Sequence, residues 1–307
     1  MTTRTKVLST MLLLVATSCG GEQADEQPRA TFEGTIVVAT NVEVQGPSGT
    51  TMASEISLVD AQGTHPLTSD GAIRDASPAW SPDGTQIAYI TIDMQLAVID
   101  RDGTGGATLT AKTADQSLWP RHPQWLPNGN ITVEVGGTLS VFGPDGTEVA
   151  VLTPPDFTDR YTLAPDGRQV AYDCSTSISS EICVFDLQTG EGRSLLTTPR
   201  PFFSLAWSPD GTQIVAGGST GAEDLPVDAA HEDLFVFAAD GSGLHALSLP
   251  GNEANPVWSP DGTQIVFNSY TGSGSDTELG LWLMNADGSE ATRLLRSAAV
   301  QPDWSTT

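Results

Sequence analysis

Polar turns and alternating hydrophobic runs recur at intervals along this chain. After a Trp, the letters Ser-Pro-Asp-Gly-Thr-Gln precede a run in which every second residue is large and apolar, as in Ile87/Tyr89 and Ile265/Phe267. Pro suits the second position of a type I turn, Asp tolerates the third, and Gly takes the left-handed position that follows. The alternation predicts a strand with one buried face. Each copy therefore predicts a tight β-hairpin, and its Trp is large enough to pack between neighbouring sheets.

The hairpin signal repeats with a spacing of roughly 40 to 50 residues, which indicates a repeat architecture. It is intact at 80–84, 207–211 and 258–262, weakened at 125–129 and 163–167, and truncated at 302–305. Six sets of middle and outer strands are expected at 35–68, 87–110, 131–153, 170–197, 214–248 and 265–295. Six inner strands are expected to end at Trp80, Trp125, Leu163, Trp207, Trp258 and Trp304. The two counts agree if the C-terminal inner strand completes the first blade. We therefore predict an all-β, six-bladed β-propeller over residues 34–307, closed by that strand.

The repeat resembles that of the TolB-type, WD40-like β-propeller family, on the Trp-Ser-Pro-Asp-Gly cores quoted above. This resemblance implies a role in protein–protein contact in the bacterial envelope, with a peptidoglycan-associated lipoprotein as the partner type. TolB-like proteins carry an N-terminal α/β domain and are soluble in the periplasm, whereas a tether and a lipid anchor are expected here. We carry over no partner-contacting residue, since many unrelated proteins share this propeller.

The N-terminus reads as a targeting segment. Arg4 and Lys6 precede a short apolar run, and Ala16-Thr17-Ser18-Cys19 resembles a bacterial lipobox with Ala16 in place of the usual Leu. We expect a lipoprotein signal peptide over 1–18, lipidation at Cys19 and a flexible polar tether over 19–33, with ordinary secretion as the alternative. Cleavage before Cys19 would move the formal net charge from −25 to −27. Such an acidic chain is a poor partner for nucleic acid or for a bare anionic membrane surface.

Two further cysteines, Cys174 and Cys183, flank one loop at the ends of neighbouring strands. In an exported protein this placement favours a disulfide, which would stabilise the fold by roughly 2–3 kcal/mol. Two free, buried cysteines are the alternative.

The sequence shows no catalytic, metal or cofactor site that we would defend. Gly217-Gly218-Ser219-Thr220-Gly221 matches G-x-S-x-G, but an acidic loop follows it where a nucleophile elbow needs a helix. The four His lack metal-ligand spacing, and D-x-D-G turns lack the glutamate that completes a calcium loop. We therefore expect no enzyme activity. The alternatives are a module of a hydrolase, lyase or peptidase system, which needs a separate catalytic domain, and a carbohydrate-binding propeller.

A set of polar residues lies three positions before each inner-strand anchor and should meet near the mouth of the central channel. The set is Ser77, His122, Arg160, Ser204, Asn255 and Gln301. These side chains either contact channel water or bind a peptide or small anion. Long loops expected on the same face, at 40–54, 174–182, 217–232 and 268–279, are either functional or tolerated insertions. They bring Tyr270 and the acidic run Glu223, Asp224, Asp228, Glu232 and Asp233 to this face. We expect a monomer that binds an envelope protein or peptide there.

Overall fold

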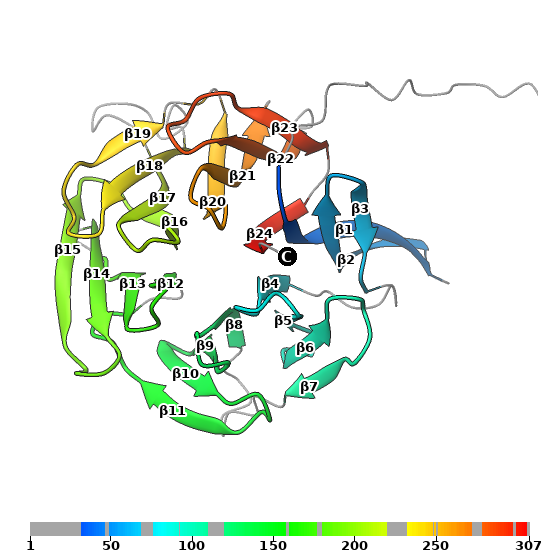
Figure 1. Ribbon diagram of the computed structural model, residues 1–307, viewed down its shortest axis with the longest axis horizontal. Helices are drawn as coiled ribbons and strands as arrows, with labels where there is room; N and C mark the ends of the chain where they lie inside the picture. Colours follow the sequence, from blue (N-terminus) through cyan, green and yellow to red (C-terminus); the bar gives the residue numbers. More distant parts are fainter. Residues whose placement is uncertain are drawn as a thin grey trace, which may run out of the picture.

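Six four-stranded antiparallel sheets form a ring in the computed structural model (Figure 1). The structure describes residues 32–46, 49–68, 76–91, 93–109, 120–157, 160–176, 180–219, 232–247, 249, 251–271, 278–296 and 299–305. No helix within these residues has the length and apolar character to cross a membrane. The prediction of an all-β, six-bladed propeller is confirmed.

Each sheet is one blade. In blades 2 to 6 the strands run in chain order from the inside of the ring to the outside, and in blade 1 the C-terminal strand takes the innermost place (Figure 1). Blade 1 consists of β24 (Ala299–Ser305), β1 (Thr35–Gly46), β2 (Gly49–Asp60) and β3 (Gly63–Pro66). Blade 2 consists of β4 (Ala76–Trp80), β5 (Gln86–Ile90), β6 (Leu96–Asp100) and β7 (Ala107–Leu109). Blade 3 consists of β8 (Pro120–Trp125), β9 (Ile131–Val135), β10 (Thr138–Phe142) and β11 (Glu148–Leu152). Blade 4 consists of β12 (Tyr161–Leu163), β13 (Gln169–Asp173), β14 (Ser180–Asp186) and β15 (Gly192–Thr198). Blade 5 consists of β16 (Phe202–Trp207), β17 (Gln213–Ser219), β18 (Glu232–Ala238) and β19 (His245–Leu247). Blade 6 consists of β20 (Asn252–Trp258), β21 (Gln264–Thr271), β22 (Glu278–Asn285) and β23 (Thr292–Arg296).

The C-terminal strand closes the ring, as the strand count predicts. β24 pairs antiparallel with β1, and Trp304 lies opposite Ile36 in the register. In Figure 1 the red C-terminal strand accordingly lies beside the blue N-terminal one. The first blade is thus built from both ends of the described chain.

The repeated turn explains why Ser, Asp and Thr recur with Pro and Gly. Ser81 Oγ donates a hydrogen bond to Asp83 Oδ1 (2.7 Å), and Thr85 donates to the same oxygen from its backbone N and its hydroxyl. The Gln86 backbone N in turn donates to Ser81 Oγ (2.9 Å). These bonds hold the pKa of Asp83 below its usual range, and the bond from the Ser81 hydroxyl contributes most. The same bonds recur in the copies at 208–213 and 259–264.

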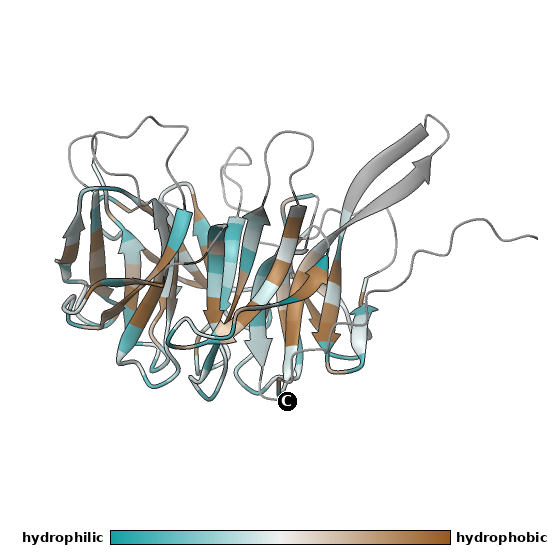
Figure 2. Cartoon of the chain, turned by 90° about the horizontal axis from the view of Figure 1, so that it is seen from above, coloured by the Kyte–Doolittle hydropathy of each residue, from teal (hydrophilic) through white to brown (hydrophobic). Residues whose placement is uncertain are grey.

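Apolar side chains from adjacent blades pack together and form the core between the sheets. Trp80 packs with Val37 and Ile56 of blade 1 as well as with Ile87 of its own blade. The indole N–H groups of Trp125 and Trp258 donate to carbonyls of the preceding blade, those of Ala79 (3.1 Å) and Ala206 (3.2 Å). Seen edge-on in Figure 2, brown apolar segments lie within the sheets, and many turns along the lower edge are teal. The Trp anchors therefore hold neighbouring sheets together, as their size predicts.

The strands extend further into the expected loops than the sequence suggested. β1 and β2 pair as far as Gly46 and Gly49, so most of the loop expected at 40–54 is a hairpin. The expected loop at 217–232 contains the end of β17, and that at 268–279 contains the ends of β21 and β22. The alternating residues that continue the strands, such as Val42 and Val44, account for the first difference. Residues 47–48, 177–179, 220–231 and 272–277 lie outside the described part of the chain.

Candidate functional site

The six inner strands surround a central channel with a volume of about 500 Å³. All six polar residues predicted for its mouth line it, and we call them the channel-mouth ring: Ser77, His122, Arg160, Ser204, Asn255 and Gln301. Prolines of the repeated turns line the channel as well: Pro82, Pro127, Pro165, Pro209 and Pro260. Since each ring residue precedes its anchor and each turn follows one, the ring and the turn prolines lie at opposite ends of the channel.

Four residues of the channel-mouth ring have a backbone conformation that non-glycine residues rarely adopt. The φ angles of Ser77, His122, Asn255 and Gln301 are 53°, 49°, 51° and 53°. Each of these residues precedes a proline, and the register of its inner strand shifts there, as in a β-bulge. A residue in such a conformation costs of order 1–3 kcal/mol and persists only where its surroundings hold it. Four of the six ring residues are therefore strained, at equivalent points of four blades.

Part of the ring holds blades together. Gln301 Oε1 accepts a hydrogen bond from the Ser77 backbone N (2.9 Å), which links blades 1 and 2. Ser204 Oγ accepts one from the Asn255 backbone N (3.1 Å), which links blades 5 and 6. Asn255 Nδ2 donates to Asn268 Oδ1 (3.2 Å) on the next strand of its own blade. Gln301 and Ser204 thus have a structural role, whatever else they contact.

Arg160 and His122 supply the cationic and imidazole groups of the ring, from adjacent blades. The guanidinium of Arg160 lies 3.3 Å from Asp173 Oδ2 and 5.2 Å from the ring centroid of Phe203. Its side chain is 39% exposed, whereas that of Asp173 is 6% exposed. The His122 carbonyl accepts a hydrogen bond from the Tyr161 hydroxyl (2.6 Å), and burial raises the pKa of Tyr161. Arg160 is therefore oriented by Asp173 and Phe203 while its charge remains accessible from the channel.

Two further channel residues were missed from the sequence, and both directly precede an anchor Trp. Asp303 Oδ2 accepts a hydrogen bond from the Trp80 backbone N (2.6 Å), and burial raises the pKa of Asp303 to about 6. Gln124 donates to the Tyr161 carbonyl (3.0 Å) and accepts from the Leu163 backbone N (2.8 Å). In the sequence, the signal that could have identified them is a polar residue directly before an anchor Trp. In the structure, both side chains link neighbouring blades.

Tyr270 lies outside the channel lining. It is half-buried in β21, opposite Asn252 and Leu279. Burial raises the pKa of Tyr270, and the charge of Glu232 adds to this rise. Of the acidic run, Glu232 and Asp233 begin β18, and the other three residues lie outside the described part of the chain. The structure therefore joins the six ring residues and places Tyr270 apart from them.

Glu253, which the sequence did not single out, is a buried carboxyl between blades 5 and 6. It is 1% exposed, and its Oε1 accepts hydrogen bonds from the Gly251 backbone N (2.9 Å) and Ser269 Oγ (3.2 Å). Its Oε2 finds no donor among the described residues. Burial, with the negative charge of Asp233 adding to it, raises the pKa of Glu253 to about 7. This carboxyl is therefore poised to titrate near neutral pH.

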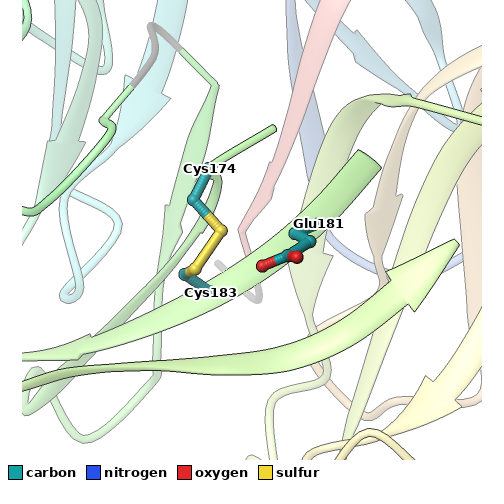
Figure 3. A group of neighbouring side chains, drawn as sticks. All are labelled: Cys174, Glu181 and Cys183. Atoms are coloured by element: carbon teal, nitrogen blue, oxygen red, sulfur yellow. A yellow bond between two sulfur atoms is a disulfide. The ribbon is translucent and has the colours of Figure 1, made fainter. Parts of the chain in front are cut away.

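The predicted disulfide is present. Cys174 and Cys183 are bonded, with Glu181 beside them (Figure 3). These three residues are the one group of three potential metal ligands that the described residues bring together. Because both sulfur atoms are in the disulfide, neither is a thiolate that could bind a metal. The pair acts as a covalent link between β14 and the segment after β13.

The first three residues of the G-x-S-x-G match, which the structure describes, lie in a sheet. Gly217, Gly218 and Ser219 belong to β17 and pair with Leu234, Asp233 and Glu232 of β18. A nucleophile elbow instead places its serine on a sharp turn between a strand and a helix. The geometry at Ser219 is that of a regular ladder.

Known proteins resemble this chain in part. No protein-family model matches it. The Tol-Pal system protein TolB of Anaeromyxobacter dehalogenans (strain 2CP-C) is 30% identical over 170 residues, which cover 54% of this chain and 36% of that protein. The uncharacterized peptidase YuxL of Bacillus subtilis (strain 168) is 29% identical over 147 residues, which cover 44% of this chain and 20% of that protein. The chain thus spans about a third or less of the length of these two relatives.

Solved structures extend the likeness to nearly the whole chain. TolB from Acinetobacter baumannii superposes with a TM-score of 0.68 at 18% identity, covering 88% of this chain and 66% of that one. A putative TolB from Agrobacterium tumefaciens superposes with a TM-score of 0.65 at 15% identity, covering 86% of this chain and 90% of that one. At these sequence identities the superpositions show a shared fold and no more. With its repeated Trp-Ser-Pro-Asp-Gly turns and its closed ring of six blades, the chain has a β-propeller fold of the TolB type.

Proposed function

We propose that this chain is a protein-binding propeller of the bacterial envelope, and that its partner contacts the channel-mouth ring. The similarity to Tol-Pal system proteins named TolB supports a role in contacts between envelope proteins. A peptidoglycan-associated lipoprotein is the partner type that this similarity suggests. The role is non-catalytic in this proposal, and the protein acts as a monomer.

The observation that carries the proposal is the convergence of polar side chains at one end of the channel. A cavity of about 500 Å³ lies within the size range of natural ligand sites and has room for a short peptide segment. Arg160 can donate hydrogen bonds to a carboxylate or to peptide carbonyls, and His122 lies on the adjacent blade. The strained backbone at four ring positions also suits a binding site, where such strain tends to gather.

We further propose that Cys19 carries the lipid that anchors the protein to the envelope. This rests on the sequence pattern, since residues 1–31 lie outside the described part of the chain. In Cys19→Ala, the protein should move from the membrane fraction to the soluble fraction or remain unprocessed. Unchanged mature mass and membrane association in this variant would contradict the anchor.

A pull-down from solubilised envelope membranes tests the binding proposal. The full-length chain should recover a single protein partner in stoichiometric amount. Retention on a glycan matrix without a protein partner would support the carbohydrate-binding alternative instead. Turnover of a peptide or glycan substrate by the purified chain would contradict the non-catalytic role.

Variants of the ring then locate the contact on the recovered partner. Arg160→Ala and His122→Asn should weaken binding by roughly 1–3 kcal/mol, the loss expected for an anchoring side chain. Asn is chosen at position 122 because it tolerates the positive φ better than Ala does. The matched controls are Thr212→Ala and Thr263→Ala, which lie in exposed turns at the other end of the propeller. Loss of affinity in the controls, with the ring variants unaffected, would refute the site.

Tyr270→Ala shows how far the contact reaches. Since Tyr270 lies outside the channel lining, a loss of affinity would extend the binding surface beyond the ring. Thermal melts of all variants separate lost contacts from lost folding. Arg160→Ala needs this check most, because it removes a cation from beside the buried carboxylate of Asp173.

A further inference from the structure

We propose that β11, the outermost strand of blade 3, is a second docking site, which accepts an extended basic segment of a partner protein by β-strand addition. The proposal concerns the rim of the propeller and is independent of the channel-mouth ring.

β11 exposes apolar side chains to an unusual extent. Val149 and Val151 are 55% and 52% exposed, the two highest values among the large hydrophobic residues that the structure describes. Glu148, which precedes Val149, and Ala150, which lies between the two valines, are exposed as well. β11 pairs with β10 on one side, and it is the last strand of its sheet. The other edge of β11 therefore presents backbone groups and two valines that share one face of the strand.

The other five outer strands carry features that discourage pairing with another chain. β7 and β19 have three residues each, and β3 ends at Pro66. β15 contains Arg193, and β23 contains Arg293 and Arg296. Short length, proline and charge are the usual means by which proteins protect sheet edges. β11 has five residues, Glu-Val-Ala-Val-Leu, without proline, lysine or arginine.

The neighbouring blade meets this strand differently from the way that blades meet elsewhere in the ring. In four blades, a glycine in the turn before the outer strand lies against a leucine at the outer strand of the preceding blade. These contacts are Gly103 with Leu67, Gly146 with Leu109, Gly241 with Leu195, and Gly288 with Leu247. In blade 4, which follows β11, the turn glycine is Gly190, and a methyl group built on it would meet nothing within 4 Å. In blade 4 the contact with the preceding blade is made instead by Gly192, which lies against Pro155 just after β11, and not by a turn glycine on the outer strand itself.

The charge around β11 selects the chemistry of the occupant. Glu148 lies on the strand, and Asp145 and Asp156 flank it in exposed turns. The sequence has no Lys or Arg from 122 to 159, and the arginine of this blade, Arg121, lies on the innermost strand. A second copy of this chain would bring the same acidic edge and a further charge of −25. A segment with alternating apolar residues and flanking Lys or Arg fits better, because its main chain pairs with β11 and its cations face the carboxylates.

A peptide titration followed by NMR on the isotope-labelled full-length chain tests the proposal. The probe is the capped peptide Lys-Val-Thr-Val-Thr-Lys. Amide signals of residues 148–152 and of the adjacent β10 should shift saturably, and raising the salt concentration should weaken binding. The matched peptide Glu-Val-Thr-Val-Thr-Glu should bind roughly tenfold more weakly or not at all.

Variants at exposed positions complete the test. Val149→Lys/Val151→Lys should reduce affinity for the basic peptide by roughly tenfold or more, since it removes two cross-strand apolar contacts and adds like charge. The control Ala107→Lys, at an exposed position of β7, should leave affinity unchanged. Absence of shifts at millimolar peptide, or shifts centred on the channel or on another edge, would overturn the proposal. Concentration-dependent shifts of β11 without peptide would also overturn it, in favour of a second copy as the occupant.

Discussion

At the scale of single residues, Glu253 is the group whose ionisation should affect stability most near neutral pH. Its pKa is about 7 in the fold, against 4.5 for an ordinary glutamate. Below pH 4.5 the carboxyl is protonated in both the folded and the unfolded chain, so folding changes nothing. Between pH 4.5 and 7 the unfolded chain releases this proton while the folded chain retains it. The free energy of unfolding therefore falls as pH rises, by roughly 3 kcal/mol in total.

Glu253→Gln should remove this dependence, because the amide resembles the protonated carboxyl and does not ionise. We expect the variant to match the wild type near pH 4.5 and to be more stable at pH 8, by a few kcal/mol at most. Urea denaturation at the two pH values measures the difference, and the raised pKa of Asp303 cancels in the comparison. The exposed Glu191→Gln is the matched control. If Glu253→Gln and the wild type respond equally to pH, burial in the fold does not raise the pKa of Glu253.

At the same scale, the sequence predicted where the ring residues lie but not which contacts they make. The period of the repeat placed all six ring residues in one channel, since each lies at the same distance from its anchor. The period could not show that Gln301 and Ser204 accept backbone hydrogen bonds from the next blade. Nor could it show the positive φ angles, because a residue before proline is expected in an extended conformation. These properties depend on contacts between blades, which single repeats do not encode.

At the scale of elements, the disulfide joins the segment after β13 to β14 over a separation of nine residues. Closing a loop of this size should stabilise the fold by roughly 2–3 kcal/mol, mainly by restricting the unfolded chain. Cys174→Ala/Cys183→Ala should lower the denaturation midpoint accordingly. Reductant should shift the wild type toward the variant and leave the variant unchanged. Equal midpoints for all four conditions would show that the bond adds nothing.

Strand lengths were the weaker part of the element-scale prediction. The turns at 80–84, 207–211 and 258–262 were predicted correctly because their hydrogen bonds are local and repeat in the sequence. β1 and β2, by contrast, have 12 residues each and are longer than every other strand that the structure describes. Their pairing links residues that have no counterpart in other blades, so the repeat gave no guide to its extent. The exposure of Val149 and Val151 was equally hidden, because the repeat predicts an outer strand but not how far its side chains are covered.

At the scale of the whole molecule, the ring was predictable because two independent strand counts had to agree. Six anchors required six inner strands, and the first blade lacked one until the C-terminus supplied it. The channel followed from that closure. The ligand that the channel binds and the identity of the partner could not be predicted from the ring, since fold alone does not determine function.

Closure of the ring by the C-terminal strand should contribute strongly to stability. Removing residues 301–307 deletes most of β24, and with it Trp304, which is 7% exposed and packs with Ile36 and Val38. It also removes the Asp303 carboxylate from the Trp80 backbone N and uncovers the edge of β1. Loss of a buried Trp alone costs about 3–5 kcal/mol, so the truncated protein should melt at a clearly lower temperature. It should also aggregate more readily, because an unpaired strand edge is open to other chains.

Two controls test whether the loss of stability comes from opening the ring. Removing residues 306–307 alone should leave the melting temperature unchanged. A synthetic peptide spanning 299–307, added to the truncated protein, should restore part of the lost stability by rebuilding β24 against β1. If the truncated protein melts with the full-length chain, the C-terminal strand does not close the first blade in solution. If it is destabilised but the peptide has no effect at high concentration, the strand pairs with β1 only when it is covalently part of the chain.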